Sequence, residues 1–128
     1  MPRVVILDDS EGFATMVAAV LSAENEVVTG QDGVEGLRLC LEAPTDLLIT
    51  DIGMPRMDGV NLLRELKRYP QTKTIPVIVL TASHFNTVPR AKFEKDPQVV
   101  AILHKPCHLT ELANKVRSVV ANRPGPAA

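Results

Sequence analysis

The chain has 128 residues, of which 45% are hydrophobic and 23% charged, and its formal net charge is −1. This size and balance indicate one globular domain, and the near-neutral charge argues against a surface built to bind nucleic acid or an anionic membrane. No apolar run approaches a membrane span, and the N-terminus has no secretory signal pattern. The two cysteines, Cys40 and Cys107, lack metal-like spacing, so free thiols and a cytoplasmic location are predicted.

Five short runs rich in β-branched residues are predicted to be strands. In chain order they cover residues 4–7, 27–29, 47–50, 77–81 and 99–103. Four of the five show little polar alternation, which is typical of parallel strands buried on both faces. Because helical periodicity separates them, the sequence predicts an α/β fold with a doubly wound parallel sheet and right-handed crossovers.

Two amphipathic helices are predicted from apolar residues at helical spacing, one after the first strand and one near the C-terminus. Each should pack one apolar face on the sheet. The first face comprises Phe13, Met16, Val17, Val20 and Leu21, and the second comprises Leu109, Leu112, Ala113, Val116 and Val120.

Two more helices are predicted from aspartates at their N-caps. Asp32 is followed by Glu35 three residues later, as in a capping box, and Asp58 precedes the next helix. The helical spacing of Val34, Leu37 and Leu41 marks the first of these helices, and Leu62, Leu63 and Leu66 are expected to face inward in the second.

The rest of the chain is less regular. Two prolines and poor apolar spacing predict one short or frayed helix in residues 83–97. Residues 123–128 are predicted to be a disordered tail or the start of a linker, which makes residues 1–122 the domain.

Polar residues stand where the predicted strands end. In a parallel sheet these ends share one edge, where open α/β folds bind their ligands. The residues are Asp8, Asp9, Asp51, Thr81 and Lys105.

These residue types indicate phosphoryl transfer. Three carboxylates repel one another, and the single charge of Lys105 does not balance them, so a hard divalent cation such as Mg²⁺ is predicted. Asp51 can then act as a nucleophile towards phosphorus, with Thr81 and Lys105 holding the phosphoryl oxygens. Taken singly, an acidic pair is also common at a helix N-terminus, and an aspartate such as Asp51 is common in a turn. The occurrence of all these residues in order at strand ends favours a functional site.

The same residues resemble the receiver domain of two-component response regulators over nearly the whole chain. The matching motifs are Asp8-Asp9, Asp51 with "MPRMDG" at 54–59, Thr81-Ala82 and Lys105-Pro106. The resemblance implies a flavodoxin-like fold with strand order 2-1-3-4-5 and about five helices, and a cis Lys105–Pro106 bond.

By this resemblance, Asp51 accepts a phosphoryl group from a sensor histidine kinase or a phosphotransfer protein. Asp9, Asp51 and the Gly53 backbone carbonyl would bind Mg²⁺, with Asp8 assisting through water. The domain would catalyse only its own phosphorylation and dephosphorylation, and signal by contact with a downstream protein, without nucleic acid or membrane insertion through this chain.

Two departures from the family pattern stand out. Three residues before the lysine the family usually has a tyrosine or phenylalanine, whose ring turns inward when the active-site threonine moves; here it is Ile102. Gly53, two residues past the acceptor, has no side chain to shield a phosphoryl group from water.

Other functions remain open at this stage. Ile102 motivates a receiver-like docking module that does not depend on phosphorylation. A small phosphatase or phosphotransferase on this architecture is disfavoured because Gly53 stands where such enzymes usually have a second acid. His104 and His108 do not share a helix face, so both are predicted to be surface or interface residues, not metal ligands.

Overall fold

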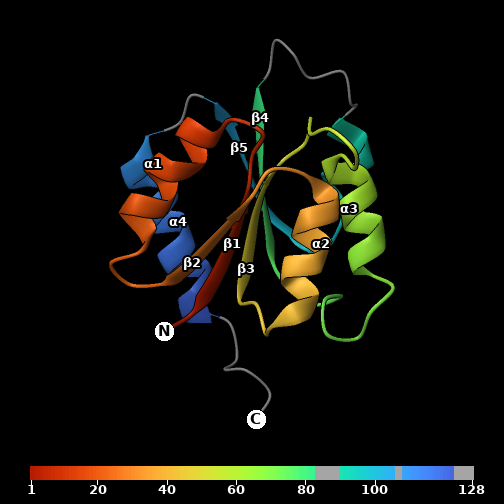
Figure 1. The fold of residues 1–128 in the computed structure, drawn as a ribbon, viewed down its shortest axis with the longest axis horizontal. Helices are drawn as coiled ribbons and strands as arrows, with labels where there is room; N and C mark the ends of the chain where they lie inside the picture. The colour runs from red at the N-terminus through yellow and green to blue at the C-terminus, as the bar shows by residue number, and fades with distance from the viewer. Residues whose placement is uncertain (83–89, 106–107, 123–128) are drawn as a thin grey trace.

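The computed structural model describes residues 1–82, 90–105 and 108–122. Its centre is a five-stranded parallel sheet in the order β2-β1-β3-β4-β5 (Figure 1). The fold class and strand order predicted from the sequence are therefore confirmed. The strands are β1 (Arg3–Leu7), β2 (Glu26–Gly30), β3 (Leu47–Asp51), β4 (Val77–Ala82) and β5 (Val99–Lys105).

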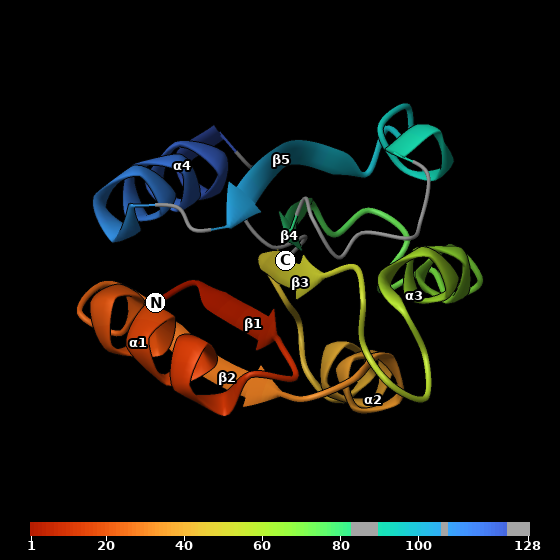
Figure 2. The ribbon, with the colours of Figure 1, turned by 90° about the horizontal axis from the view of Figure 1, so that it is seen from above.

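Helices cover both faces of the sheet (Figure 2). Helices α1 (Glu11–Leu21) and α4 (Leu109–Asn122) pack on one face, and α2 (Gly33–Glu42) and α3 (Gly59–Leu66) on the other. The predicted N-caps are confirmed, because Asp32 accepts a hydrogen bond from the Glu35 N–H at 2.8 Å and Asp58 from the Asn61 N–H at 2.9 Å. These caps fix where α2 and α3 leave the carboxyl edge of the sheet.

Burial follows from the position of each strand in the sheet. All of β1 and the first four residues of β3 are buried, since helices cover both of their faces. The edge strands β2 and β5 are more exposed, and on β5 Val100 and His104 are exposed. Buried Cys40 lies in the α2 side of the core, where burial raises the pKa of its thiol to about 11.

The predicted apolar face of α1 was partly wrong. Met16 and Val20 are 54% and 41% exposed, whereas Ala14, Val17 and Leu21 are buried. The buried residues of the helix form one row at i, i+3 and i+7, and Phe13 and Ala18 pack against the same core cluster while partly exposed. The apolar stripe in the sequence is wider than this contact row, so its outer members remain in solvent.

The described residues contain four α-helices, not the five expected. In the described part of 83–97 the structure has a 3₁₀ helix, Arg90–Lys92, followed by Phe93, which is buried on the α2–α3 side of the sheet. The predicted cis Lys105–Pro106 bond, Cys107 and the 123–128 tail lie outside the described residues. No described helix is long and apolar enough to cross a membrane.

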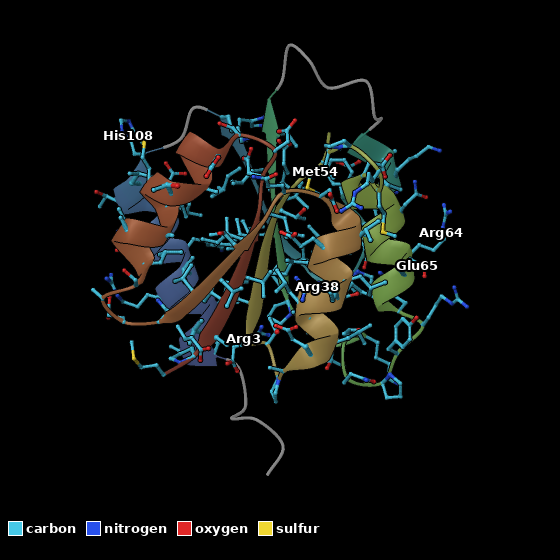
Figure 3. All side chains as sticks on the ribbon, viewed as in Figure 1. Arg3, Arg38, Met54, Arg64, Glu65 and His108 are labelled. Carbon is cyan, nitrogen blue, oxygen red and sulfur yellow. The ribbon has the colours of Figure 1, made fainter. Side chains whose placement is uncertain are left out.

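The amino edge of the sheet contains a buried arginine (Figure 3). Arg3 Nη1 lies 2.9 Å from the Leu39 carbonyl, 3.1 Å from the Ala43 carbonyl and 2.8 Å from Thr45 Oγ1. Its Nη2 is 3.6 Å from the half-exposed carboxylate of Glu42. Arg3 thus ties β1 to the end of α2.

Candidate functional site

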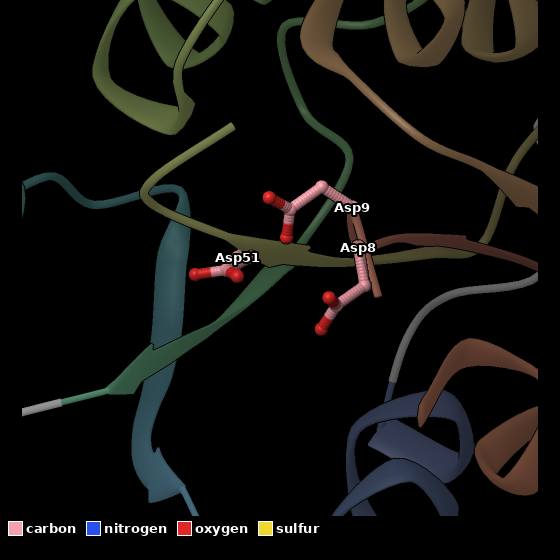
Figure 4. A group of neighbouring side chains, drawn as sticks. All are labelled: Asp8, Asp9 and Asp51. Carbon is pink, nitrogen blue, oxygen red and sulfur yellow. The ribbon is translucent and has the colours of Figure 1, made fainter. Parts of the chain in front are cut away.

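Three carboxylates meet at the carboxyl edge of the sheet (Figure 4). Asp8 and Asp9 follow β1, and Asp51 ends β3, the strand that pairs with β1. One oxygen from each of the three lies within 4.8 Å of the others. Asp8 is buried, the Asp51 side chain is 13% exposed, and Asp9 is exposed, so the cluster opens to solvent on the side of Asp9.

Lys105 joins this cluster from the end of β5. Its Nζ donates to Asp8 Oδ2 at 2.5 Å and to Asp51 Oδ2 at 3.1 Å, and lies 4.7 Å from the centre of the Phe13 ring. Burial acts to lower the pKa of Lys105, but the hydrogen bonds and charges of the two aspartates outweigh it and raise the pKa above its ordinary value. The ammonium is therefore held charged between the two carboxylates.

Backbone N–H groups hold the two paired carboxylates in place. Ser10 N–H donates to Asp8 Oδ1 at 2.8 Å, and Gly53 N–H donates to Asp51 Oδ1 at 3.3 Å. Each bond spans two residues, as in an Asx turn, so the turn chemistry after each strand aims the carboxylate into the site.

The loop between β3 and α3 is fastened to α2. The Arg56 guanidinium binds Asp32 Oδ2 through Nε at 2.8 Å and Nη2 at 2.7 Å, and Gly33 N–H donates to the Met57 carbonyl at 3.0 Å. Arg56 has φ of 64°, a left-handed conformation that is costly for a side chain with Cβ. The hydrogen bond that Asp32 accepts from the Glu35 N–H is the main reason why the pKa of Asp32 lies below its usual value, and the Arg56 hydrogen bond and charge add to the effect.

Thr81 lies near the end of β4 and is only 3% exposed. Its Oγ1 is 3.0 Å from His104 Nδ1, across the β4–β5 pair. Sequence analysis placed His104 on the surface, and it is exposed, but the contact with Thr81 was missed. The register that sets Thr81 opposite His104 could have indicated it, because side chains of paired residues lie on the same face.

Gly53 is exposed at the mouth of the site. A Cβ built on it meets no heavy atom within 4 Å, so a larger side chain fits there. None of the described glycines has a positive φ, so its backbone also accepts other residues.

The donor set at this edge fits a hard divalent cation. Carboxylate oxygens are the ligands that Mg²⁺ prefers, and two of the three side chains are within reach of solvent water. Within residues 1–82, 90–105 and 108–122, this is the one group of three or more acidic, histidine or cysteine side chains placed closely enough to hold a metal. Among the same described residues, His104 and His108 belong to no such group.

Comparison with known families gives a match to the model of the response regulator receiver domain over residues 4–117. The chain belongs to this family. Receiver domains are signalling domains of two-component systems, and the resemblance drawn from the motifs is thereby confirmed.

Relatives with known names are longer proteins that contain such a domain. The chain is 32% identical over 120 residues to the sensor histidine kinase TmoS of Ectopseudomonas mendocina, covering 94% of this chain and 12% of TmoS. It is 38% identical over 81 residues to the response regulator PleD of Caulobacter vibrioides, covering 62% of this chain and 18% of PleD. The receiver domain thus spans less than a fifth of either relative.

Solved structures show the same fold over nearly the whole chain. The chemotaxis response regulator CheY4 of Vibrio cholerae superposes with a TM-score of 0.80 at 31% identity, covering 93% of this chain and 98% of CheY4. A putative response regulator from Chloroflexus aurantiacus gives a TM-score of 0.82 at 32% identity, covering 95% of this chain and all of that one.

Proposed function

We propose that this receiver domain is a phosphorylation-dependent switch in which Asp51 accepts a phosphoryl group in a reaction that requires Mg²⁺. The donor is a sensor histidine kinase or a phosphotransfer protein. The observation that supports this most strongly is the grouping of Asp51 with two further carboxylates and the Lys105 ammonium. That arrangement places beside the nucleophilic oxygen an ammonium that neutralises phosphoryl charge and carboxylates that would hold a divalent cation for the same purpose.

The chemistry asked of Asp51 is the formation of an acyl phosphate. One carboxylate oxygen forms a bond to phosphorus as the donor's phosphorus–nitrogen bond breaks. The hydrogen bond from Gly53 N–H to Asp51 Oδ1 fixes the carboxylate, so that its orientation is set before the donor arrives.

Two side chains are assigned to the phosphoryl oxygens. Lys105 Nζ already lies 3.1 Å from Asp51 Oδ2, close enough to transfer one of its hydrogen bonds to an incoming oxygen. Thr81, buried near the end of the neighbouring strand β4, offers a hydroxyl proton to another.

The metal ligands in this proposal are Asp9, Asp51 and the Gly53 carbonyl, with Asp8 acting through water. When bound, Mg²⁺ offsets the repulsion between the carboxylates and the phosphoryl oxygens. Asp8 Oδ2 and Asp51 Oδ2 are paired with Lys105 in this structure. A bound metal ion and the Lys105 ammonium would therefore compete for the same carboxylates.

The domain turns over no external metabolite in this proposal. It performs its own phosphorylation and slow hydrolysis in the cytoplasm, and output passes to a downstream protein through contact. An exchange between two conformational states, biased by the acyl phosphate, is the means of output.

The test is phosphorylation by a small phosphodonor, acetyl phosphate, with and without Mg²⁺, read by intact mass. We expect the wild type to gain one phosphoryl group only with Mg²⁺ and Asp51→Asn to gain none. Asp58→Asn is the matched control, since Asp58 lies in the same loop but caps α3. Labelling of Asp51→Asn at the wild-type level would contradict the proposal.

A docking role independent of phosphorylation is the alternative, motivated by Ile102 at the position of the usual aromatic ring. It predicts that Asp51→Asn leaves the affinity for a purified partner unchanged. The switch proposed here predicts that wild-type affinity changes on phosphorylation and that this change is lost in Asp51→Asn.

A further inference from the structure

The hydrogen bond between Thr81 and His104 lies beside the proposed phosphoryl site. Thr81 and His104 are direct partners in the β4–β5 register, and the distance from Oγ1 to Nδ1 is 3.0 Å. Thr81 is almost fully buried, whereas His104 is exposed on β5, an edge strand of the sheet. The pair thus links a buried hydroxyl of the site to the molecular surface.

His104 also stands on the same side of β5 as Ile102. Side chains two residues apart along a strand share a face, and Ile102 packs against the core cluster that includes Val79 of β4. Ile102 offers no polar atom to Thr81. On this face of β5, the aromatic ring of this chain is that of His104, two residues nearer to the site than the position of Ile102, where the family usually has its ring. The His104 ring contacts Thr81 in this structure.

We propose that His104 is a positioning residue that holds the Thr81 hydroxyl in the unphosphorylated domain and releases it when a phosphoryl group occupies Asp51. This inference rests on the proposed function, because it assigns a regulator to the same site. It replaces the missing aromatic switch at Ile102 with a hydrogen-bonded one at His104.

The physical basis is that a threonine hydroxyl has one proton to donate. In this proposal the Thr81 hydroxyl donates to Nδ1 in the unphosphorylated state, which requires the His104 tautomer with its proton on Nε2. When a phosphoryl oxygen accepts the hydrogen bond from the Thr81 hydroxyl, Nδ1 loses that donor. A water molecule then donates a hydrogen bond to Nδ1 instead. The loss of this hydrogen bond changes the contacts of the imidazole at the exposed edge, so a partner bound at β5 can detect the state of Asp51.

The competition has a direct thermodynamic consequence. Any group that binds the Thr81 hydroxyl must first break the bond to His104, so removing the imidazole should strengthen binding of a phosphoryl mimic. A net hydrogen bond corresponds to roughly a fivefold change in an equilibrium constant. The effect should vanish when Thr81 has no hydroxyl to compete for.

The experiment measures beryllofluoride affinity with Mg²⁺ for His104→Val, His104→Asn and both changes in a Thr81→Val background. We expect His104→Val to bind roughly fivefold tighter, and His104→Asn, whose side-chain oxygen can replace Nδ1, to stay within about twofold of wild type. In the Thr81→Val background the two His104 variants should be equal.

Nitrogen NMR of the His104 ring in the wild-type domain gives a readout that needs no variant. We expect the Nε2–H tautomer with a hydrogen-bonded Nδ1, and a shift of the Nδ1 signal on saturation with beryllofluoride. An unmoved Nδ1 signal together with unchanged affinity in His104→Val would overturn this inference and leave the proposed function standing. Absence of saturable binding by the wild type would overturn both.

Discussion

The two edges of the sheet each hold a basic side chain, Arg3 buried and Lys105 partly buried, but different oxygens surround the two cations. At the amino edge, Arg3 contacts two backbone carbonyls and a threonine hydroxyl, with one carboxylate at 3.6 Å (Figure 3). At the carboxyl edge, the Lys105 ammonium lies between the carboxylates of Asp8 and Asp51.

The difference separates a structural cation from an exchangeable one. Neutral carbonyls at a helix end have no net charge to attract a competing ion, so they hold Arg3 permanently. Carboxylates left with surplus negative charge attract any cation that reaches them. The same local motif, a basic side chain at the edge of the sheet, therefore stabilises one edge and leaves the other able to respond.

The largest expected effect is at the amino edge. Arg3→Met leaves buried acceptors at Leu39, Ala43 and Thr45 without their donor, and should lower the free energy of unfolding by about 3 kcal/mol. Urea unfolding measures this, and the loss should be the same with and without Mg²⁺. Recovery of stability by Mg²⁺ would contradict the assignment of Arg3 as structural.

At the carboxyl edge, Lys105→Met should bind Mg²⁺ roughly tenfold more tightly, because the competing ammonium is gone. The variant should lose stability without the metal and regain it with the metal, since Mg²⁺ binds only the folded domain. Exposed Lys73, in the turn before β4, supplies the matched control as Lys73→Met. Equal Mg²⁺ affinity in all three proteins would mean that lysine and metal do not compete.

Substitution of Asp32 tests whether the carboxyl edge also contains contacts that are purely structural, as those of Arg3 are at the amino edge. Asp32→Ala removes the N-cap of α2 and the partner of Arg56, and should cost about 1 kcal/mol at neutral pH. The pKa of Asp32 is below its ordinary value of 3.8, so its contribution is complete above that value and is lost as pH falls through the lower folded pKa. Urea unfolding from pH 7 to pH 3 should show the wild type and variant converging.

The matched control for this prediction is Asp58→Ala, which removes the N-cap of α3. It should cost less than Asp32→Ala, because Asp32 also binds the arginine that pins the acceptor loop. A larger loss from Asp58→Ala would show that the Arg56 pair adds nothing to stability.

The smallest expected effect is at the mouth of the site. Gly53→Gln should slow loss of the phosphoryl group roughly threefold, because the longer side chain partly screens it from water. Gly53→Ala, whose methyl group is too short to reach, is the control and should hydrolyse at the wild-type rate. Identical rates in all three proteins, followed by mass spectrometry after removal of donor, would refute the screening role.

Much of the fold can be predicted from the sequence, because short runs with strand character alternate regularly with segments of helical periodicity. The strand-end rule also brought Asp8, Asp51 and Lys105 to one edge without any contact information. Local pattern could not decide how wide the buried face of α1 is: that depends on how the helix sits on the sheet. Met16 and Val20 were misplaced for this reason.

The contacts that sequence alone missed both join distant segments. In the sequence, Arg3 looks like a polar residue at the start of a strand. Its role becomes clear only from the structure, in which the end of α2 lies beside it. His104 reads as an exposed residue until the β4–β5 register sets it opposite Thr81. In each case the residue type also fits an ordinary surface position. Its partner is visible only when the three-dimensional arrangement of the two distant segments is known.

The pair of Asp8 and Lys105 joins residues 97 positions apart, near the two ends of the described chain. Asp8 follows β1 and Lys105 closes β5, and β3 and β4 lie between these strands in the sheet, so the pairings β1–β3, β3–β4 and β4–β5 bring the two groups together. Asp51 therefore lacks its lysine partner until β5 has paired with β4. Under the proposed function, the domain becomes competent for phosphorylation only after this last strand has joined the sheet.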